Sequence, residues 1–86
     1  MDRQRIDKWL WHARIVRTRS AATALAAAGY VRINSRRAAA GAPVRKGDVV
    51  TVALDRSVRV VEVAAFCERR GDSADARALY VALAAR

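Results

Sequence analysis

Residue types that build catalytic and metal sites are scarce in this sequence of 86 residues. Its single cysteine, Cys67, excludes an internal disulfide and a thiol metal cluster. Its single histidine, His12, has no second histidine or nearby cysteine, so the sequence offers neither a zinc site nor a Cys–His dyad. We expect His12 to be solvated or loosely packed, and Cys67 to be a buried thiol without a chemical role.

Glycine and proline are also few, with four glycines and one proline in the chain. Each glycine stands alone at a turn position, so the sequence contains no glycine-rich phosphate loop. A chain this short leaves little room for a ligand cleft of ~300 Å³ or more. We therefore predict that the protein is not an enzyme and holds no cofactor or metal.

Long apolar segments are missing as well. No uninterrupted apolar run approaches the ~18 residues that a membrane-spanning helix needs. The amino-terminal end is polar and charged, and no apolar segment follows it, which argues against a signal peptide. Together with the unpaired cysteine, this pattern predicts a cytoplasmic protein without a membrane partner.

Acidic residues are outnumbered by basic ones, with eight Asp and Glu against 17 Lys and Arg, and the net charge is +9. Residues 1–37 alone carry nine basic and two acidic residues, a net charge of +7. A concentrated basic field on a small folded unit indicates a polyanionic partner, and many separated charges favour nucleic acid. No stretch combines a large apolar face with a lysine-rich face, so a membrane surface fits less well.

Two helices are predicted within this basic segment. Apolar spacing places the first from about Ile6 to Ala13, with Trp11 off the apolar stripe and expected to pack against a later element. Thr18 is the predicted N-cap of a second helix over residues 19–28. That helix is almost all alanine, and its one large apolar residue, Leu25, is expected to anchor it in the core.

The rest of the chain is predicted to form a small sheet and a closing helix. The expected strands cover residues 30–33, 49–54 and 58–66, with a bulge in the third. Residues 38–44 are interpreted as a loop. Ser73 is the predicted N-cap of a helix over about residues 74–84. We expect residues 1–86 to form a single domain.

Six arginines flank the start of the second helix and the turn at Asn34: Arg5, Arg14, Arg17, Arg19, Arg36 and Arg37. If the two helices pack side by side, several of these arginines share one face. The N–H groups at the Thr18 end of the helix add a positive partial charge, which favours phosphate. Arginine also contacts phosphate bidentately and stacks on bases. The alternative is that these charges only keep a small domain soluble.

The order of the residues helps to decide between a phosphate-binding surface and charges that only keep the domain soluble. The string R-I-D-K-x-L at residues 5–10 is followed by T-R-S-x-A-x-x-L-x-x-x-G-x-V-x-I-N at residues 18–34, and then by Gly47 and Asp48. This order resembles the RNA-binding domain named after ribosomal protein S-four, also called the alpha-L motif. The match covers about residues 3–54.

Two further stretches are similar to one branch of that family. DKWLWHARIVRTRSAA (residues 7–22) and CERRGDSADARALY (residues 67–80) resemble its small ribosome-associated heat-shock members. The resemblance implies an α+β fold in which two N-terminal helices pack on a small antiparallel sheet. An extra strand and a closing C-terminal helix would occupy about residues 58–85.

The resemblance also implies non-catalytic RNA binding along the helix-turn-helix edge. In the heat-shock branch the partner is ribosomal RNA in a large subunit that still carries a nascent chain on a tRNA. By position, the implied RNA contacts are Arg5, Lys8, Arg17, Thr18, Arg19, Asn34 and Arg36. We add Arg14 and Arg37 as neighbouring cations, and expect Asp7 to be structural, pairing with Arg19. We expect a monomer.

Two other functions compete with this interpretation. A DNA-binding helix-turn-helix protein would need base-reading side chains along its second helix, and residues 19–28 offer almost none. A protein-interaction module with incidental charge is the second alternative. The family usually has Asn-Gly where this chain has Asn34-Ser35. A type I′ turn needs positive φ at both positions, which costs serine more than glycine, so the sequence leaves the turn type open.

Overall fold

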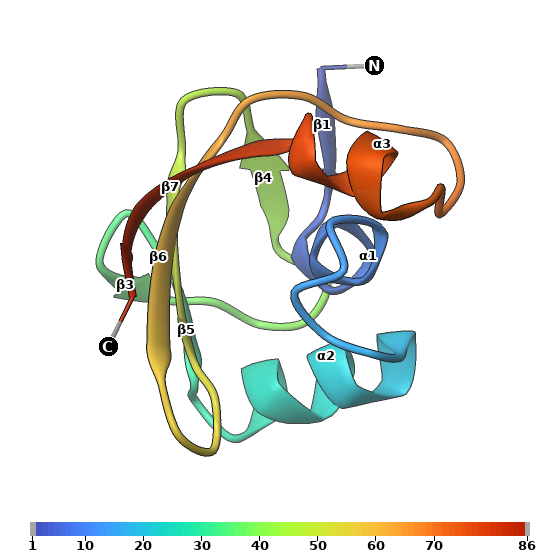
Figure 1. The fold of residues 1–86 in the computed structure, drawn as a ribbon. Coiled ribbons are helices and arrows are strands. Elements are labelled where there is room, and N and C mark those ends of the chain that lie inside the picture. The colour runs from blue at the N-terminus through green and yellow to red at the C-terminus, as the bar shows by residue number, and fades with distance from the viewer. Residues whose placement is uncertain (1, 86) are drawn as a thin grey trace.

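The computed structural model describes residues 2–85 (Figure 1). Within them two sheets are arranged around the first two helices, and a third short helix precedes the last strand. In chain order the elements are β1 (Arg3–Arg5), α1 (Ile6–His12), α2 (Arg19–Ala27), β2 (Val31–Ile33), β3 (Arg36–Arg37), β4 (Pro43–Arg45), β5 (Val49–Ala53), β6 (Val58–Val63), α3 (Ser73–Arg77) and β7 (Tyr80–Ala85).

The first helix forms as its apolar spacing predicts. Ile6, Trp9 and Leu10 are fully buried on its inner face, and Trp9 Nε1 donates to the Ala65 carbonyl at 3.1 Å. Trp11 packs as expected against a later segment, because Arg70 donates from Nε to the Trp11 carbonyl at 3.0 Å and its guanidinium lies 5.7 Å from the indole centroid.

The second helix is capped as predicted, since the Thr18 side chain accepts from the Ala21 N–H at 3.0 Å. Its core contacts differ from the expectation. Ala22 and Ala26 are the buried residues, whereas Leu25 is only half-buried at the edge of the core. Small side chains on the inner face allow the helix to pack closely, so no large residue is needed there.

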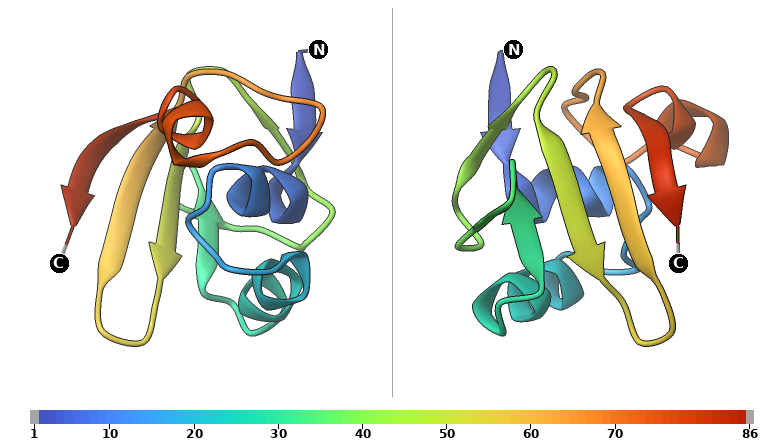
Figure 2. Two further views of the ribbon diagram at one scale, coloured as in Figure 1. Left: turned by 45° about the vertical axis from the view of Figure 1, so that its right-hand side comes forward. Right: turned by 90° about the vertical axis from the view of Figure 1, so that its left-hand side faces the viewer.

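The main sheet is antiparallel, with strand order β3-β2-β5-β6-β7, and α1 and α2 cover one of its faces (Figure 2). Alternate valines of its strands point at the helices and are fully buried: Val31, Val50, Val52, Val61 and Val63. This alternation is the period of two that a half-buried strand requires. The sheet therefore carries the core that positions the helix pair.

The turn between β2 and β3 has the type that the sequence left open. Asn34 has φ 51° and Ser35 has φ 70°, which are the two positive values of a type I′ turn. The hairpin keeps this turn although serine replaces the usual glycine. Asn34 stabilises it, because its amide donates to Asp48 Oδ1 at 3.0 Å and accepts from the Val49 N–H at 2.9 Å.

A second, two-stranded sheet joins β1 to β4 and was not predicted. Residues 38–44 were expected to be loop, but the chain from Pro43 pairs antiparallel with β1, and Val44 is fully buried. Three-residue strands are too short to show an alternating pattern. Pro43 begins its strand, a position where the missing N–H is tolerated.

The closing helix is shorter than predicted. The helix α3 ends at Arg77 and is capped by Asp72 instead of Ser73, in a capping box with Asp75. Residues 80–85 pair with β6 as the strand β7. The alanine-rich sequence favours a helix, but the open edge of β6 supplies partners for the main chain, so pairing overrides local propensity.

The third predicted strand also ends early, at Val63 instead of residue 66. The expected bulge is present at this pairing, but its extra residue lies on β7. Val60 pairs with Ala84 and Val61 with Ala82, which leaves Leu83 without an opposite residue.

Candidate nucleic-acid interface

A buried carboxylate organises the corner between β1, α1 and α2. Asp7 is only 2% exposed, and Arg5 grips it with two hydrogen bonds, from Nε to Oδ1 at 3.2 Å and from Nη2 to Oδ2 at 3.0 Å. Arg19, the first residue of α2, approaches from the other helix, with Nη2 3.8 Å from Oδ1. The expected pairing of Asp7 with Arg19 is confirmed, and Arg5 is the closer partner.

Two further donors complete the environment of Asp7. The Lys8 N–H donates to Oδ1 at 2.7 Å, and the Thr23 hydroxyl shares its single hydrogen between Oδ2 at 3.3 Å and the Arg19 carbonyl at 3.1 Å. Burial alone raises the pKa of this carboxyl, but the hydrogen bonds and positive charges around it outweigh burial and lower the pKa below its ordinary value. Asp7 therefore stays ionised at neutral pH.

An open hollow lies beside this corner along α2. Its lining residues are Arg5, Asp7, Arg19, Ser20, Thr23, Ala24 and Ala27. Arg37 reaches the far end, where its Nη2 donates to the Ala27 carbonyl at 3.1 Å. An added Cβ at Gly29 would lie 3.1 Å from Arg37 Cζ, so the glycine leaves room for this guanidinium. Two predicted arginines, Arg5 and Arg19, thus border one hollow that is suited to an anion, and Arg37 lies beside its Ala27 end.

Two other arginines that were predicted to contact RNA, Arg14 and Arg17, do not line this hollow. Arg14 has φ 56° and donates from Nε and Nη2 to the Gly71 carbonyl at 3.0 and 2.8 Å, which ties the loop after α1 to the loop before α3. Arg17 lines a separate hollow with Leu25 and Arg56. The structure therefore does not gather all the predicted cations at one place.

The remaining predicted residues have varied surroundings. Lys8 is half-buried on α1, the Thr18 hydroxyl caps α2, and Arg36 is exposed on β3. The Asn34 amide already bonds to Asp48 and Val49, so its visible role is to hold the turn. RNA contact at each of these positions stays a prediction.

Sequence reasoning missed two small polar residues of the hollow, Ser20 and Thr23. A signal was available in the spacing, because Arg19, Thr23 and Ala27 follow one another at i, i+4 and i+8 and so lie on one side of a helix. A single threonine among alanines was too weak a pattern to separate a site residue from a neutral helix residue.

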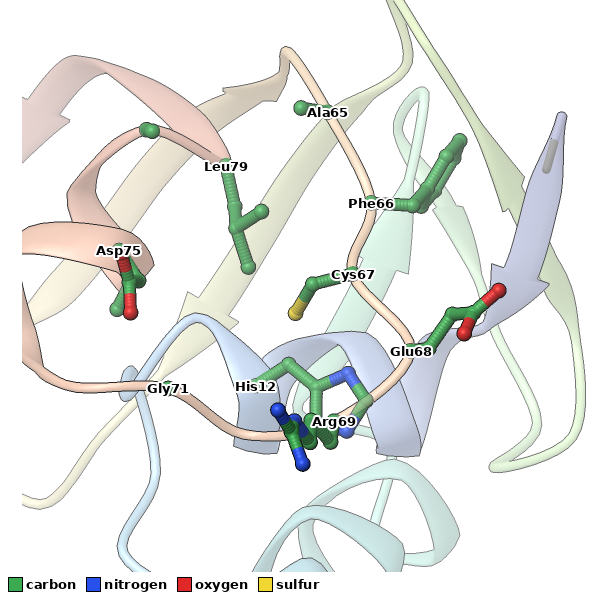
Figure 3. A pocket seen from close by; sticks show the side chains of 11 residues that line it. His12, Ala65, Phe66, Cys67, Glu68, Arg69, Gly71, Asp75 and Leu79 are labelled. Carbon is green, nitrogen blue, oxygen red and sulfur yellow. The ribbon is translucent and has the colours of Figure 1, made fainter.

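His12 and Cys67 meet at a different hollow (Figure 3). His12 on α1 faces the loop that carries Cys67, with Leu79 across the space. Contrary to expectation, His12 is 1% exposed, and burial and the charge of Lys8 lower its pKa. Burial raises the pKa of the half-buried Cys67 thiol, which is the opposite of an activated nucleophile.

Residues 2–85 contain neither a candidate membrane span nor a candidate metal cluster. No helix in that range is long and apolar enough to cross a membrane. Nowhere in the same range do three or more His, Cys, Asp or Glu side chains gather in a group that could hold a metal ion.

Comparison with known proteins shows which family and which proteins this chain resembles. The model of the S4 domain family matches residues 4–50. Heat shock protein 15 of Escherichia coli K12 and its homologue in Haemophilus influenzae are 34% and 33% identical over 76 residues, which is 88% of this chain. The chain spans about 57–58% of the length of these relatives.

A solved structure agrees over most of the chain. The structure of Vibrio cholerae heat shock protein 15, described as trimeric, superposes with a TM-score of 0.89 at 30% identity. The superposition covers 96% of this chain and 84% of that one. The similarity therefore includes α3 and β7, which lie outside the region matched by the S4 domain model.

Proposed function

Because the chain belongs to the S4 domain family and shares the fold of heat shock protein 15, we propose that it is a non-catalytic RNA-binding protein of the heat-shock type. The observation that carries the proposal is the pair of guanidinium groups at the Asp7 corner. Arg5 and Arg19 have side chains 55% and 44% exposed, and both border the same hollow. Exposed, oriented guanidinium groups suit the phosphates of a folded RNA.

The proposed RNA is structured ribosomal RNA in a large ribosomal subunit, with a nascent chain on a tRNA as a further feature of the target. This finer statement follows from the heat-shock resemblance. It also suits the exposed arginines of the site, because double-helical RNA is recognised by its grooves and phosphates more than by its base sequence. We further propose that residues 1–86 act as one domain in the cytoplasm.

The oligomeric state is a separate question. The Vibrio cholerae relative is described as trimeric, whereas the sequence predicted a monomer for this chain. Nothing in the proposed RNA contact requires a second copy, since Arg5, Asp7 and Arg19 come from one chain.

DNA binding is a less suitable function for this surface. A recognition helix reads base edges with side chains such as Arg, Asn or Gln. The side of α2 at the hollow presents Ser20, Thr23, Ala24 and Ala27, and its one long side chain, Arg19, is paired with Asp7. This helix is therefore suited to phosphate contact.

Sedimentation of cell lysate with and without ribonuclease tests the proposal. The protein should travel with large ribosomal subunits and lose that association after ribonuclease treatment, and crosslinking should map it to ribosomal RNA. Purified protein should bind an RNA hairpin with an affinity that falls steeply as salt rises. Association with particles that survives ribonuclease would support a protein-interaction module instead.

A further inference from the structure

The acidic residue Asp7 lines a hollow whose proposed ligand, RNA, is itself negatively charged. We propose that Asp7 holds Arg5 and Arg19 as a preformed seat for one RNA phosphate, so that this acidic residue strengthens RNA binding. The inference rests on the proposed RNA-binding function. It goes further by assigning the ligand of the hollow, a single phosphodiester group, and by naming Asp7 as its positioning residue.

The donor inventory of the two arginines supports this seat. A guanidinium carries five N–H donors. Arg5 directs two of them, on Nε and Nη2, to Asp7, which leaves three for another acceptor. Arg19 forms an ion pair with Asp7 at 3.8 Å, and its side chain is 44% exposed. Arg5 is thus held by two hydrogen bonds and Arg19 by charge attraction alone, and both keep N–H groups that can donate.

The carboxylate itself is shielded from the ligand. Asp7 is 2% exposed, and its oxygens accept from Arg5, from the Lys8 N–H and from the Thr23 hydroxyl. The group of Asp7 with its two arginines keeps a net charge of +1. A phosphate in the hollow therefore meets cations at its surface while the negative charge lies beneath them.

The energetic benefit is pre-organisation. Ordering a flexible side chain on binding costs conformational entropy, and arginine is among the most flexible. When Asp7 orders both side chains before RNA binds, this entropy is lost on folding, so RNA binding no longer has to offset it. The small residues Ser20, Thr23, Ala24 and Ala27 line the rest of the hollow, so a phosphate can approach α2 closely.

The test compares two substitutions that change the charge equally. Asp7→Asn and Asp55→Asn each raise the net charge by one, and Asp55 is exposed in the loop after β5. Charge alone predicts equal or tighter binding of an RNA hairpin by both variants. We expect Asp7→Asn to bind about 5–100-fold more weakly, since two side chains lose their fixed geometry. We expect Asp55→Asn to bind at least as tightly as the wild type.

A second readout separates positioning from general damage to the fold. Loss of the seat should reduce the log–log dependence of affinity on salt by about 0.7–0.9 for Asp7→Asn, which is one phosphate contact. If Asp7→Asn matches Asp55→Asn while Arg19→Ala still weakens binding, the inference is wrong and RNA binding stands. If the wild type binds no RNA, the proposed function itself is wrong.

The wild-type protein provides a test that does not depend on a variant folding. The Arg5 Nε–H should give a protected NMR signal in the free protein, because it donates to Asp7. That protection should persist when the RNA hairpin is added, since the phosphate takes the other N–H groups. Rapid exchange of the Nε–H with solvent in both states would overturn the inference.

Discussion

The arginines of this surface are held in two different ways. Arg5 and Arg19 meet a buried carboxylate from two separate elements, whereas Arg14 and Arg37 donate to main-chain carbonyls. The first pair faces one hollow with donors to spare. The second pair joins segments of the chain, a loop to a loop and β3 to the end of α2. Arginines that carry the same charge therefore have different roles, and the number of arginines in a segment does not identify which of them contact RNA.

The largest expected effect comes from removing each pair in turn. Arg5→Ala with Arg19→Ala should lower the salt dependence of RNA affinity by about 0.7–0.9 on the log–log scale, because the one phosphate contact that the two arginines share is lost. Arg14→Ala with Arg37→Ala removes the same charge but should change the slope less and lower the melting temperature less, because the first double variant leaves the buried Asp7 without its cations. Binding titrations over a salt series and thermal unfolding measure both quantities. Equal slopes in the two double variants would remove the distinction between the pairs.

The carboxylate-held pair should also respond to acid. The pKa of Asp7 is lowered from its ordinary value of 3.8, so the folded state favours the ionised form. Its stabilising contribution is therefore fully present above that value and is lost as the pH falls through the lower, folded-state pKa. The free energy of unfolding of wild type should exceed that of Asp7→Asn by about 1.5–3 kcal/mol at neutral pH.

Chemical denaturation of both proteins from neutral pH to strong acid gives this difference directly. It should stay constant at mild pH and shrink at acidic pH. A difference that does not depend on pH would show that Asp7 contributes by its shape and not by its charge.

The carbonyl-held pair gives a smaller effect. Arg37→Ala should destabilise the fold by about 0.5–1 kcal/mol, because a cation is removed from the carbonyl end of α2. The neighbouring Arg36 is exposed on the same strand and serves as the matched control, with an expected change near zero. Equal melting temperatures for the two variants would argue that the bond to Ala27 adds nothing measurable.

The smallest effect concerns the turn that carries β3. Ser35→Gly should raise the free energy of unfolding by about 0.5 kcal/mol, since glycine adopts a φ of 70° without a side-chain penalty. RNA affinity should be unchanged, because no donor at the hollow moves. A stability loss would mean that the flexibility added to the unfolded chain outweighs the strain removed.

Local signals explain which elements were predicted well. The first helix has a continuous apolar stripe, and the second has Thr18 before an alanine run and Gly29 after it. Both signals act within a few residues, so one sequence is enough to find them. The position of the turn at Asn34 was predicted for the same reason. Its type was not predicted, because Asn34 is held by Asp48 and Val49, which lie at the start of β5 and are distant in the sequence.

Elements that depend on distant partners were missed. Neither β1 nor β4 has a pattern of its own, and each exists because the other lies beside it. Residues 80–85 have a helix-prone composition and become a strand only because β6 offers an open edge. Leu25 is the largest apolar residue of its helix, yet the helix turns Ala22 and Ala26 inward. Burial is settled by packing in three dimensions, which local propensity does not contain.

The sequence alone determined the basic character of the chain, its helix pair and the set of arginines near it, because charge, periodicity and capping are properties of neighbouring residues. Tertiary structure decided which arginines share a hollow. Arg5, Asp7 and Arg19 come from β1, α1 and α2, and the packing of these elements brings both guanidinium groups within 4 Å of the carboxylate. Electrostatic attraction falls with distance and rises with burial, so the fold determines the chemical role of each charge.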